Sequence, residues 1–209
     1  MKEKIALIYG TLLGDGCLSK VGNARFISIT CSLYSDIPFF EFIRPIIEEI
    51  RGKPIKFYKS HKQGKVEINF SDVNMFNKFV SLGFPIGKKG TEIQIPNKFD
   101  LPMKPLIQGY FATDGSLVIT NNNGTSYPRI EFSSISKNLL TQIKVYLASL
   151  EIGGNIYISK KYNNHWNSLY RLQINGKKKL VIFHKKIGFI NPKHQEKYEQ
   201  FKKSGGTEI

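Results

Sequence analysis

Two similar stretches decide the fold: Ile8-Tyr9-Gly10-Thr11-Leu12-Leu13-Gly14-Asp15-Gly16 and Ile107-Gln108-Gly109-Tyr110-Phe111-Ala112-Thr113-Asp114-Gly115. In both, an apolar residue stands two positions before a glycine, and an Asp-Gly pair begins five positions after that glycine. Each stretch leads directly into β-like sequence. A pattern that occurs once in each half of a 209-residue chain predicts an internal duplication.

Each stretch also has the spacing of a helix with two different faces. Gly10 and Gly14 are four residues apart, and Gly109 and Thr113 repeat this spacing of small residues. Small residues on one helix face allow a second helix to approach closely, because the interaxial distance depends on the side chains at the contact. We therefore expect the two helices to pack against each other as interface helices.

The two halves show the same order of expected elements: helix, hairpin, helix, hairpin, helix. This αββαββα order predicts an α+β fold with a first half at 1–84, a proline-rich linker at 85–104, a second half at 105–203 and a tail at 204–209. Four of the helices have expected N-terminal caps. These caps are Ser35, Ser71 or Asp72, Ser136 and Asn175.

The composition favours a folded protein that binds a polyanion. Apolar residues make up 41% of the chain, and 31 basic residues against 16 acidic ones give a net charge of +15. Both halves carry an excess of basic residues, which favours nucleic acid as the partner, with an anionic membrane surface second and a merely soluble cationic protein third. Cys17 and Cys31 fit neither a metal spacing nor a disulfide framework, so a reducing compartment is expected. We expect no signal peptide and no membrane span, hence a cytoplasmic or organellar location.

The two aspartates are the residues that predict chemistry. If each Asp-Gly pair ends its helix, with the glycine as a left-handed cap, then Asp15 and Asp114 lie at the negative ends of two helix dipoles. Side-by-side packing brings both carboxylates together, where they repel each other unless cations are bound. Hard oxygen ligands with room for water and phosphate suit magnesium (Mg²⁺). Such a site, beneath a basic surface, is typical of metal-assisted phosphodiester hydrolysis.

In its paired motifs and repeated order of elements, the chain resembles the LAGLIDADG homing endonucleases in their single-chain, two-motif form. The resemblance covers nearly the whole chain and includes Gly87-Lys88-Lys89 and Ile93-Gln94-Ile95-Pro96 between the halves. It is strongest to compact archaeal and organellar intron-encoded members. It implies a monomer with pseudo-symmetric halves, in which two four-stranded antiparallel sheets form a saddle over double-stranded DNA. It also implies Mg²⁺ as the cofactor, with Mn²⁺ or Ca²⁺ able to substitute in binding.

The resemblance assigns roles to individual residues near the scissile phosphates. Asp15 and Asp114 match the metal-binding acids, and Gly14 and Thr113 match positions whose carbonyls help to bind metal. Lys88 and Lys193 match the basic residue that each half places near the cut phosphates. Many members carry a water-positioning glutamine where the second strand turns into its helix. Here those places read Cys31-Ser32 and Ser133-Ser134, and no glutamine is present.

The same resemblance predicts that polar residues of the sheets read the DNA target. Because successive strand residues point to opposite faces, about half of these residues are expected to lie on the exposed face. The candidates are Arg25, Lys56, Tyr58, Lys65, Glu67 and Asn69 in the first half, and Arg129, Glu131, Lys160, Tyr162, Trp166, Tyr170, Arg171 and Gln173 in the second. Lysine and arginine suit phosphate or guanine, whereas asparagine and glutamine suit adenine.

Three functions follow from these observations. The first is a site-specific double-strand DNA endonuclease that leaves 3′ overhangs, as the resemblance implies. The second is a binding protein of the same fold, either an intron RNA maturase or a DNA-binding regulator that does not cleave. The third is an unrelated basic structural protein, which accounts for the charge but not for the duplicated motif. The presence of both Asp15 and Asp114 favours the endonuclease.

Overall fold

A computed structural model describes residues 1–122, 124–159 and 167–206. The first half contains α1 (Lys2–Asp15), β1 (Gly16–Val21), β2 (Ala24–Ser32), α2 (Ile37–Arg51), β3 (Phe57–Ser60), β4 (Lys65–Ser71) and α3 (Val73–Ser81). The second half contains α4 (Met103–Asp114), β5 (Gly115–Asn122), β6 (Thr125–Ser134), α5 (Lys137–Ser149), β7 (Asn155–Ile158), β8 (Tyr170–Asn175) and α6 (Lys177–Lys186), followed by α7 (Pro192–Lys203).

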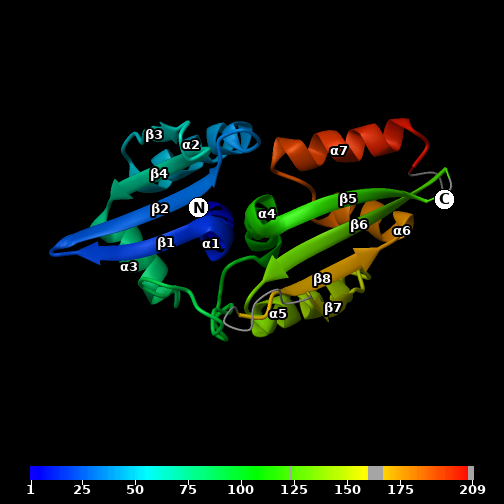
Figure 1. The fold of residues 1–209 in the computed structure, drawn as a ribbon. Helices are drawn as coiled ribbons and strands as arrows, with labels where there is room; N and C mark the ends of the chain where they lie inside the picture. The colour runs from blue at the N-terminus through cyan, green and yellow to red at the C-terminus, as the bar shows by residue number, and fades with distance from the viewer. Residues whose placement is uncertain (123, 160–166, 207–209) are drawn as a thin grey trace.

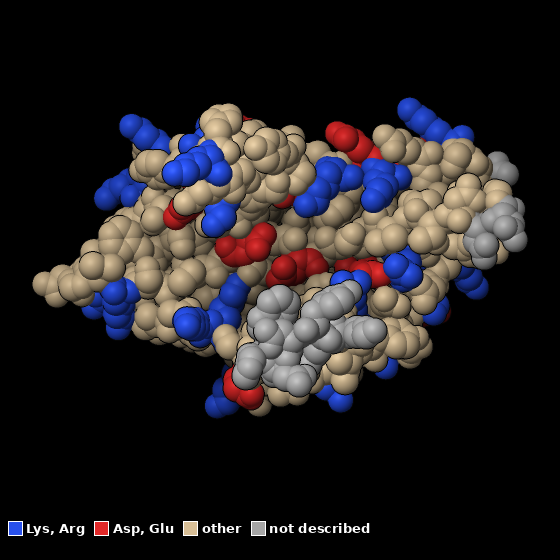
Figure 2. Space-filling view, viewed as in Figure 1, with Lys and Arg blue, Asp and Glu red and all other residues tan. Residues whose placement is uncertain are grey.

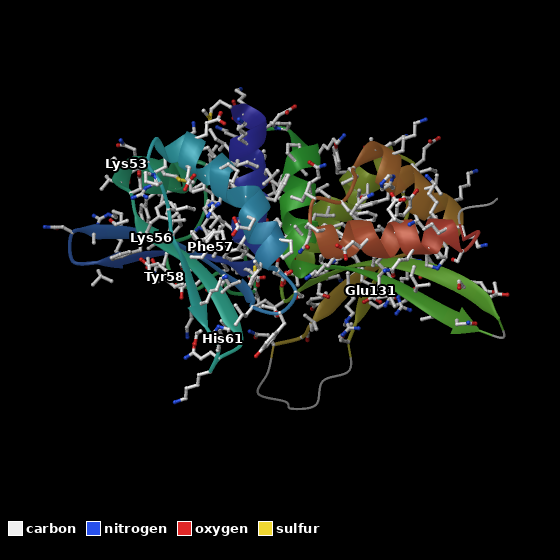
Figure 3. All side chains as sticks on the ribbon, turned by 90° about the horizontal axis from the view of Figure 1, so that it is seen from above. Lys53, Lys56, Phe57, Tyr58, His61 and Glu131 are labelled. Carbon is white, nitrogen blue, oxygen red and sulfur yellow. The ribbon has the colours of Figure 1, made fainter. Side chains whose placement is uncertain are left out.

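The sheet topology confirms the predicted duplication and the α+β class. Each half forms a four-stranded antiparallel sheet, in the order β1-β2-β4-β3 in the first half and β5-β6-β8-β7 in the second. The two sheets lie next to each other on one side of the molecule, and most of the helices lie behind them (Figures 1 and 3). One face of each sheet is therefore covered, and the other is left open.

Alternation of apolar and polar residues along the strands explains why each sheet has one apolar face and one polar face. In β4, Val66, Ile68 and Phe70 are buried against the helices, whereas Lys65 and Asn69, at alternate positions of the same strand, are exposed. Successive strand residues point to opposite faces, so this pattern places apolar side chains in the core and polar ones on the open face.

The contact between α1 and α4 joins the halves, as the small-residue spacing predicted. A Cβ atom added to Gly10 would lie 1.9 Å from the carbonyl oxygen of Leu106, and one added to Gly109 would lie 2.1 Å from that of Leu7. The two helix backbones are therefore in direct contact at these glycines. Only residues without a side chain allow this approach.

Two of the four expected helix caps are confirmed, and two are wrong. Asp72 and Ser136 accept hydrogen bonds from the backbone N–H groups of Met75 and Leu139. The residue at the N-terminal cap of α2 is Asp36 rather than Ser35. The hydroxyl group of Ser35 donates a hydrogen bond to the carboxylate of Asp36. Asn175 cannot cap α6, because its backbone pairs with β6 as the last residue of β8; Gly176 stands at the cap.

The expected left-handed glycine caps are also wrong. Gly16 and Gly115 have φ angles of −101° and −94°, so each already has the extended backbone of the strand it begins. Both positions instead require glycine for space. An added Cβ atom would lie 2.4 Å from Leu12 at Gly16 and 2.3 Å from Phe111 at Gly115.

The second half begins two residues earlier than predicted and contains one helix that was not predicted. Helix α4 begins at Met103, so its first two residues belong to the predicted linker. Helix α7 was not predicted, because most of its residues are polar. Its buried residues His194, Tyr198 and Phe201 recur at intervals of four and three, which is the helical signal that the sequence contains. In Figure 1 this helix lies beside β5, the edge strand of the second sheet. Among the described residues, no helix is long and apolar enough to cross a membrane.

The close contact of α1 and α4 gives a first testable prediction. Gly10→Ala should lower the free energy of unfolding by roughly 2–4 kcal/mol, because the new methyl group meets backbone that no change of rotamer can move. Urea denaturation measures the loss. Gly153→Ala is the matched control, since nothing lies within 4 Å of a Cβ atom added there. Equal stability of the two variants would contradict direct backbone contact.

Candidate active site and nucleic-acid interface

The C-terminal ends of α1 and α4 bring the two predicted acids to one place. Asp15 and Asp114 are the last residues of these helices. A Cβ atom added to Gly14 would lie 2.0 Å from Oγ1 of Thr113 and 3.3 Å from Oδ2 of Asp114. The end of one helix is therefore in contact with the end of the other, and both carboxylates lie at the negative ends of helix dipoles.

The site is electrostatically strained in the absence of a cation. Burial, and then the negative charge of Asp15, raise the pKa of Asp114 to about 7. Burial also raises the pKa of Asp15, although a hydrogen bond from Sγ of Cys31 to its Oδ2 (3.4 Å) and the charge of Lys89 oppose this rise. Two buried acids with raised pKa values are a site that favours a bound cation.

The lysine that reaches the acids from the linker is Lys89. Its Nζ donates to the carbonyl oxygens of Leu12 (3.0 Å), Leu13 (3.0 Å) and Gly14 at the end of α1. Burial lowers the pKa of this amine, while the charges of Asp114 and Asp15 oppose the decrease. The predicted Lys88 is exposed instead. Lys89, rather than Lys88, is therefore the linker lysine that contacts the end of α1 beside the acids, and the predicted role of Lys88 near the cut phosphates stays a prediction.

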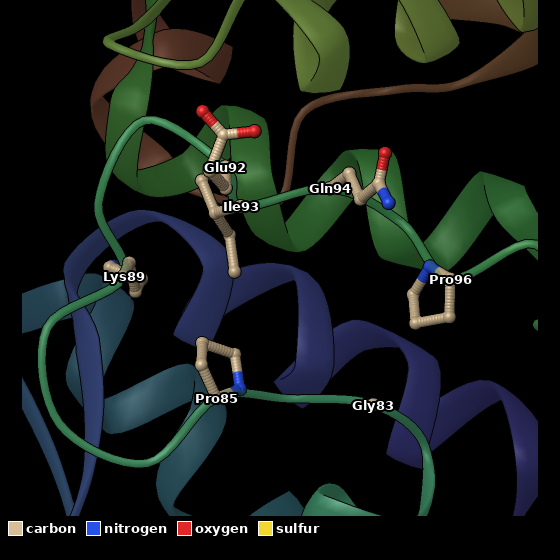
Figure 4. Close-up of a pocket in the computed structure, with 7 residues that line it drawn as sticks. All are labelled: Gly83, Pro85, Lys89, Glu92, Ile93, Gln94 and Pro96. Atoms are coloured by element: carbon tan, nitrogen blue, oxygen red, sulfur yellow. The ribbon is translucent and has the colours of Figure 1, made fainter.

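The linker holds Lys89 from both sides. Before it, the N–H of Gly87 donates to the carbonyl of Leu18 (2.7 Å). After it, Ile95 exchanges two hydrogen bonds with the side chain of Gln142 on α5. Between these anchors the linker lines a pocket next to α1, with Lys89 at one end and Pro96 at the other (Figure 4). Backbone hydrogen bonds thus fix which lysine faces the acids.

The second predicted lysine, Lys193, approaches from the other half. Its Nζ lies 2.7 Å from Oδ1 of Asp36, and its positive charge is one of those that act on Asp15. The negative charges near Lys89 oppose the lowering of its pKa, and Asp114 has the largest such effect. Lys89 from the linker therefore acts on both aspartates, and Lys193 from the second half acts on Asp15.

The oxygen atoms at this site suit a divalent metal ion. The carboxylates of Asp15 and Asp114 and the nearby carbonyls of Gly14 and Thr113 are the hard ligands that Mg²⁺ prefers. Within the described ranges, no group of three or more His, Cys, Asp or Glu residues could hold a metal ion. An ion bound here would therefore complete its coordination with water or with oxygen atoms of a bound molecule.

The two places where a glutamine was expected lie beside the acids. Cys31 donates to Asp15, as described above. Ser133 and Ser134 line a hollow of about 210 Å³ together with Asp114 and Lys89. The hollow is wide enough for water, and two hydroxyl groups border it.

The open face of the first sheet carries most of the residues predicted there. Tyr58 pairs across the sheet with Glu67, and together with Asn69 and Phe26 they line a shallow hollow. Lys65 lies on the same face of β4, and Lys56 is exposed just before β3 (Figure 3).

Arg25 and Tyr170 are two of the predicted sheet residues that do not lie on the open face. Arg25 stands two residues before the buried Ile27 on β2, and its Nη1 donates to the carbonyls of Gly22 and Ala24. Tyr170 stands two residues before the buried Leu172 on β8 and packs against the core. Residues two apart on a strand share a face, so both side chains lie on the helix side.

Glu131 organises the open face of the second sheet. Its side chain is buried and forms ion pairs with Arg129 and Arg171 (3.7 Å to Oε2), and Nε2 of Gln173 donates to Oε1 (3.2 Å). Figure 3 places Glu131 at the open side of the sheet. Four predicted residues are therefore connected by two ion pairs and one hydrogen bond, all centred on Glu131. The remaining candidates Lys160, Tyr162 and Trp166 lie outside the described residues.

Sequence reasoning missed two exposed tyrosines on this face. Tyr127 stands two residues before Arg129, and Tyr157 pairs with Arg171 across the sheet. Both side chains are about half exposed. Strand alternation, counted from Arg129 and Arg171, is the signal that could have found them. Seen from the same side as Figure 1, acidic side chains gather near the middle of the molecule, and Lys and Arg side chains surround them (Figure 2).

Comparison with known protein families finds a match to the second half of the chain. Residues 103–188 match the family described as the LAGLIDADG-like domain. The second half is therefore similar to a LAGLIDADG-like domain. The first half repeats the sheet topology of the second strand for strand, so the chain contains two copies of this architecture.

Solved structures match most of the chain. The homing endonuclease I-DmoI, in a complex with DNA and Mn, matches with a TM-score of 0.62 and 17% identity, covering 90% of this chain and 97% of that one. I-LtrWI, a LAGLIDADG homing endonuclease bound to target DNA, matches with a TM-score of 0.61 and 12% identity, covering 96% and 88%. At these identities the matches show a shared LAGLIDADG fold.

A curated relative extends the likeness to an archaeal sequence. An uncharacterised protein of Methanocaldococcus jannaschii is 24% identical over 173 residues, which cover 80% of this chain. The match spans 61% of the relative, so the archaeal protein is the longer of the two.

The raised pKa of Asp114 predicts how stability depends on pH without metal. Between its ordinary pKa and about 7, folded Asp114 keeps a proton that the unfolded chain releases, so stability falls as pH rises. Asp114→Asn removes this loss. In EDTA at pH 8 the variant should be more stable than wild type by on the order of 2 kcal/mol. Each pKa unit corresponds to about 1.4 kcal/mol, and a buried amide without full hydrogen bonding regains only part of the stability that the buried carboxylate loses.

Urea denaturation in EDTA from pH 4 to pH 8 measures this difference, which should vanish toward pH 4. Asp100→Asn is the control, because Asp100 is an exposed acid paired with Lys2. A variant that is less stable than wild type at pH 8 would show that Asp114 is not strained.

Proposed function

We propose that this chain is a site-specific endonuclease that cuts both strands of double-stranded DNA with the help of a divalent metal ion. The observation that carries the proposal is the pair of buried aspartates at the ends of two packed helices, between two open sheet faces of a protein with net charge +15. The LAGLIDADG-like domain and the fold shared with DNA-bound homing endonucleases support it.

Each part of the site has a role in hydrolysis. Asp15 and Asp114 would hold the metal ion through their carboxylates, with the carbonyls of Gly14 and Thr113 nearby. A bound divalent ion supplies a hydroxide nucleophile at neutral pH and stabilises the leaving oxygen. Lys89 and Lys193 would contact the scissile phosphates and neutralise the charge that develops on them. Lys88 stays a more distant candidate, since its side chain is exposed.

The two sheets would read two different half-sites, because the halves differ in sequence. The first sheet offers Lys56, Tyr58, Lys65, Glu67 and Asn69, and the second offers the group centred on Glu131. Lysines and arginines bind phosphate or guanine, and Asn69 and Gln173 suit adenine. A long, asymmetric target follows, which a single chain can bind as a monomer.

The finer features of the proposal follow the resemblance. The metal would be Mg²⁺, with Mn²⁺ or Ca²⁺ able to substitute in binding, and the cut would leave 3′ overhangs. An intron-encoded enzyme of this kind would act in the compartment that holds the genome, either a prokaryotic cytoplasm or an organelle.

The deciding experiment uses DNA that carries the gene's own insertion site without the intron. Purified protein should linearise this DNA with Mg²⁺ and leave it intact with EDTA. Tight binding to the intron RNA together with no Mg²⁺-dependent cutting would replace the endonuclease by a maturase.

The aspartates give the sharpest prediction for this function. Asp15→Asn and Asp114→Asn should each abolish double-strand cutting, because the amide carries no charge to hold the metal ion. DNA affinity should stay within about threefold, since most of the affinity comes from phosphate contacts elsewhere. Plasmid linearisation and gel-shift titration measure the two effects, with Asp100→Asn as the exposed control. Wild-type cutting by either variant would remove that aspartate from the metal site.

The buried Glu131 predicts an effect on specificity. Glu131→Gln should release Arg129 and Arg171 from their ion pairs and leave them to bind any phosphate. Non-specific affinity should rise while the ratio of specific to non-specific affinity falls roughly tenfold, since one well-ordered base contact contributes about 1–3 kcal/mol of discrimination. Competition titration with random-sequence DNA measures this ratio. Glu92→Gln on the linker is the control, and an unchanged ratio in Glu131→Gln would count against the ordering role.

A further inference from the structure

A buried polar cluster joins the two halves outside the aspartate pair. Asp36 precedes α2 in the first half, and only 6% of it is exposed. Its Oδ2 accepts hydrogen bonds from the N–H of Ser32 (3.3 Å) and the hydroxyl of Ser35 (3.0 Å). These bonds fix the carboxylate within the turn between β2 and α2.

The other oxygen of Asp36 is bound by the second half. Oδ1 accepts hydrogen bonds from Nδ2 of Asn191 (2.9 Å) and Nζ of Lys193 (2.7 Å). Asn191 is fully buried, and its Nδ2 also donates to the carbonyl of Ala112 (2.9 Å), two residues before Asp114. Its Oδ1 accepts from the N–H of Lys193 (3.2 Å) and so caps α7. One network therefore connects the β2–α2 turn, the end of α4 and the start of α7.

Lys193 is the mobile member that this network restrains. Its side chain is about one-third exposed, whereas that of Asp36 is 9% exposed. An unpaired lysine samples many rotamers, and restraining them costs free energy each time the side chain makes a contact. The pairing with Asp36 restrains the side chain before any other contact is made, and it leaves the amine near enough for its charge to act on Asp15.

Among the residues that the structure describes, no equivalent of this network surrounds Asp114. The residue that precedes α5, in the place of Asp36, is the neutral Ser136, whose hydroxyl accepts from the N–H of Leu139. The lysine near Asp114 is Lys89, which is held by backbone carbonyls of α1 rather than by a carboxylate. The two ends of the site thus hold their lysines by different means.

We propose that Asp36 and Asn191 are positioning residues that hold Lys193 against the scissile phosphate at the Asp15 end of the site, and that they serve the cutting of one DNA strand only. This inference rests on the proposed endonuclease function. Asp36 touches neither DNA nor metal in this role and acts through Lys193. The carboxylate can keep one hydrogen bond to the ammonium group while the other N–H bonds of that group turn toward a phosphate oxygen.

Burial and charge favour this arrangement over a purely structural one. Burial alone would raise the pKa of Asp36, but the hydrogen bonds from Lys193 and Asn191 outweigh burial and hold the pKa below its ordinary value. The acid therefore stays ionised at neutral pH. A buried charge next to the negative Asp15 is stable only with its cation, so Asp36 keeps Lys193 in place rather than merely capping a helix.

The test measures the cutting of each strand separately, with the insertion-site DNA labelled on one strand or the other. Lys193→Met identifies the strand that Lys193 serves. Asp36→Asn should slow the same strand by roughly 10- to 100-fold, the size expected when a catalytic group is displaced. The other strand should change by less than about twofold, so that nicked DNA accumulates.

Asp72→Asn is the matched control, because Asp72 is also a first-half acid that precedes a helix and pairs with a basic residue, Arg51. It should leave the ratio of the two strand rates unchanged even if it lowers stability. If Asp36→Asn does not fold, Asn191→Ser provides the same test, since serine keeps the cap of α7 but cannot reach Asp36.

The outcomes distinguish this inference from the proposed function. A wild-type protein that cuts neither strand overturns both. A wild-type protein that cuts both strands, with variants of Asp36 or Asn191 that slow the two strands equally or not at all, overturns the positioning role alone. A change confined to the strand that Lys193→Met identifies supports it.

Discussion

The direct backbone contact between α1 and α4 is the constraint on which the rest of the structure depends. Gly10 and Gly109 bring the two helices so close that a single methyl group at either position would meet a carbonyl oxygen of the partner helix. Because both helices end in aspartate, the same contact that joins the halves also forces two carboxylates together. Stability of the fold and chemistry of the site therefore arise from one interface.

The two carboxylates shape the arrangement of charge around them. Burial raises the pKa values of both acids, and the negative charge of Asp15 raises that of Asp114 further. The charge of Lys89 opposes both increases, and that of Lys193 opposes the increase at Asp15. The ammonium group of Lys89 lies on the carbonyls of α1, including that of Gly14. This is where a helix dipole favours a cation. A metal ion that used the Gly14 carbonyl would take a position that the lysine holds in this structure, so metal binding and the placement of Lys89 are linked.

Patterns that repeat within one element could be predicted from the sequence. The small-residue spacing of the two motifs predicted the helix pair, and alternating apolar residues together with turn signals predicted two similar halves. Features that depend on contacts between distant elements could not be predicted. Asp36 and Asn191 are 155 positions apart, and no local pattern connects them. The group around Glu131 forms across two paired strands, and its register was not known until the strands were paired.

Single-residue errors show the same limit. Lys88 and Lys89 are chemically identical, and only the hydrogen bonds that anchor the linker at Gly87 and Ile95 decide which one faces the acids. Arg25 could not be assigned to a face from the sequence, because a strand shifted by one residue exchanges its two faces. The prediction of left-handed caps was wrong because Gly16 and Gly115 already have the extended backbone of the strand that follows.

The central claim is that α1 and α4 hold Asp15 and Asp114 close enough to repel each other. The most direct test is a ¹³C NMR titration of the Asp114 carboxyl group in metal-free protein, for wild type and for Asp15→Asn. The account predicts a pKa of about 7 in wild type, and a lower value in the variant that stays above the ordinary one because burial remains. A pKa near the ordinary value of aspartate in wild type, unchanged by Asp15→Asn, would contradict it.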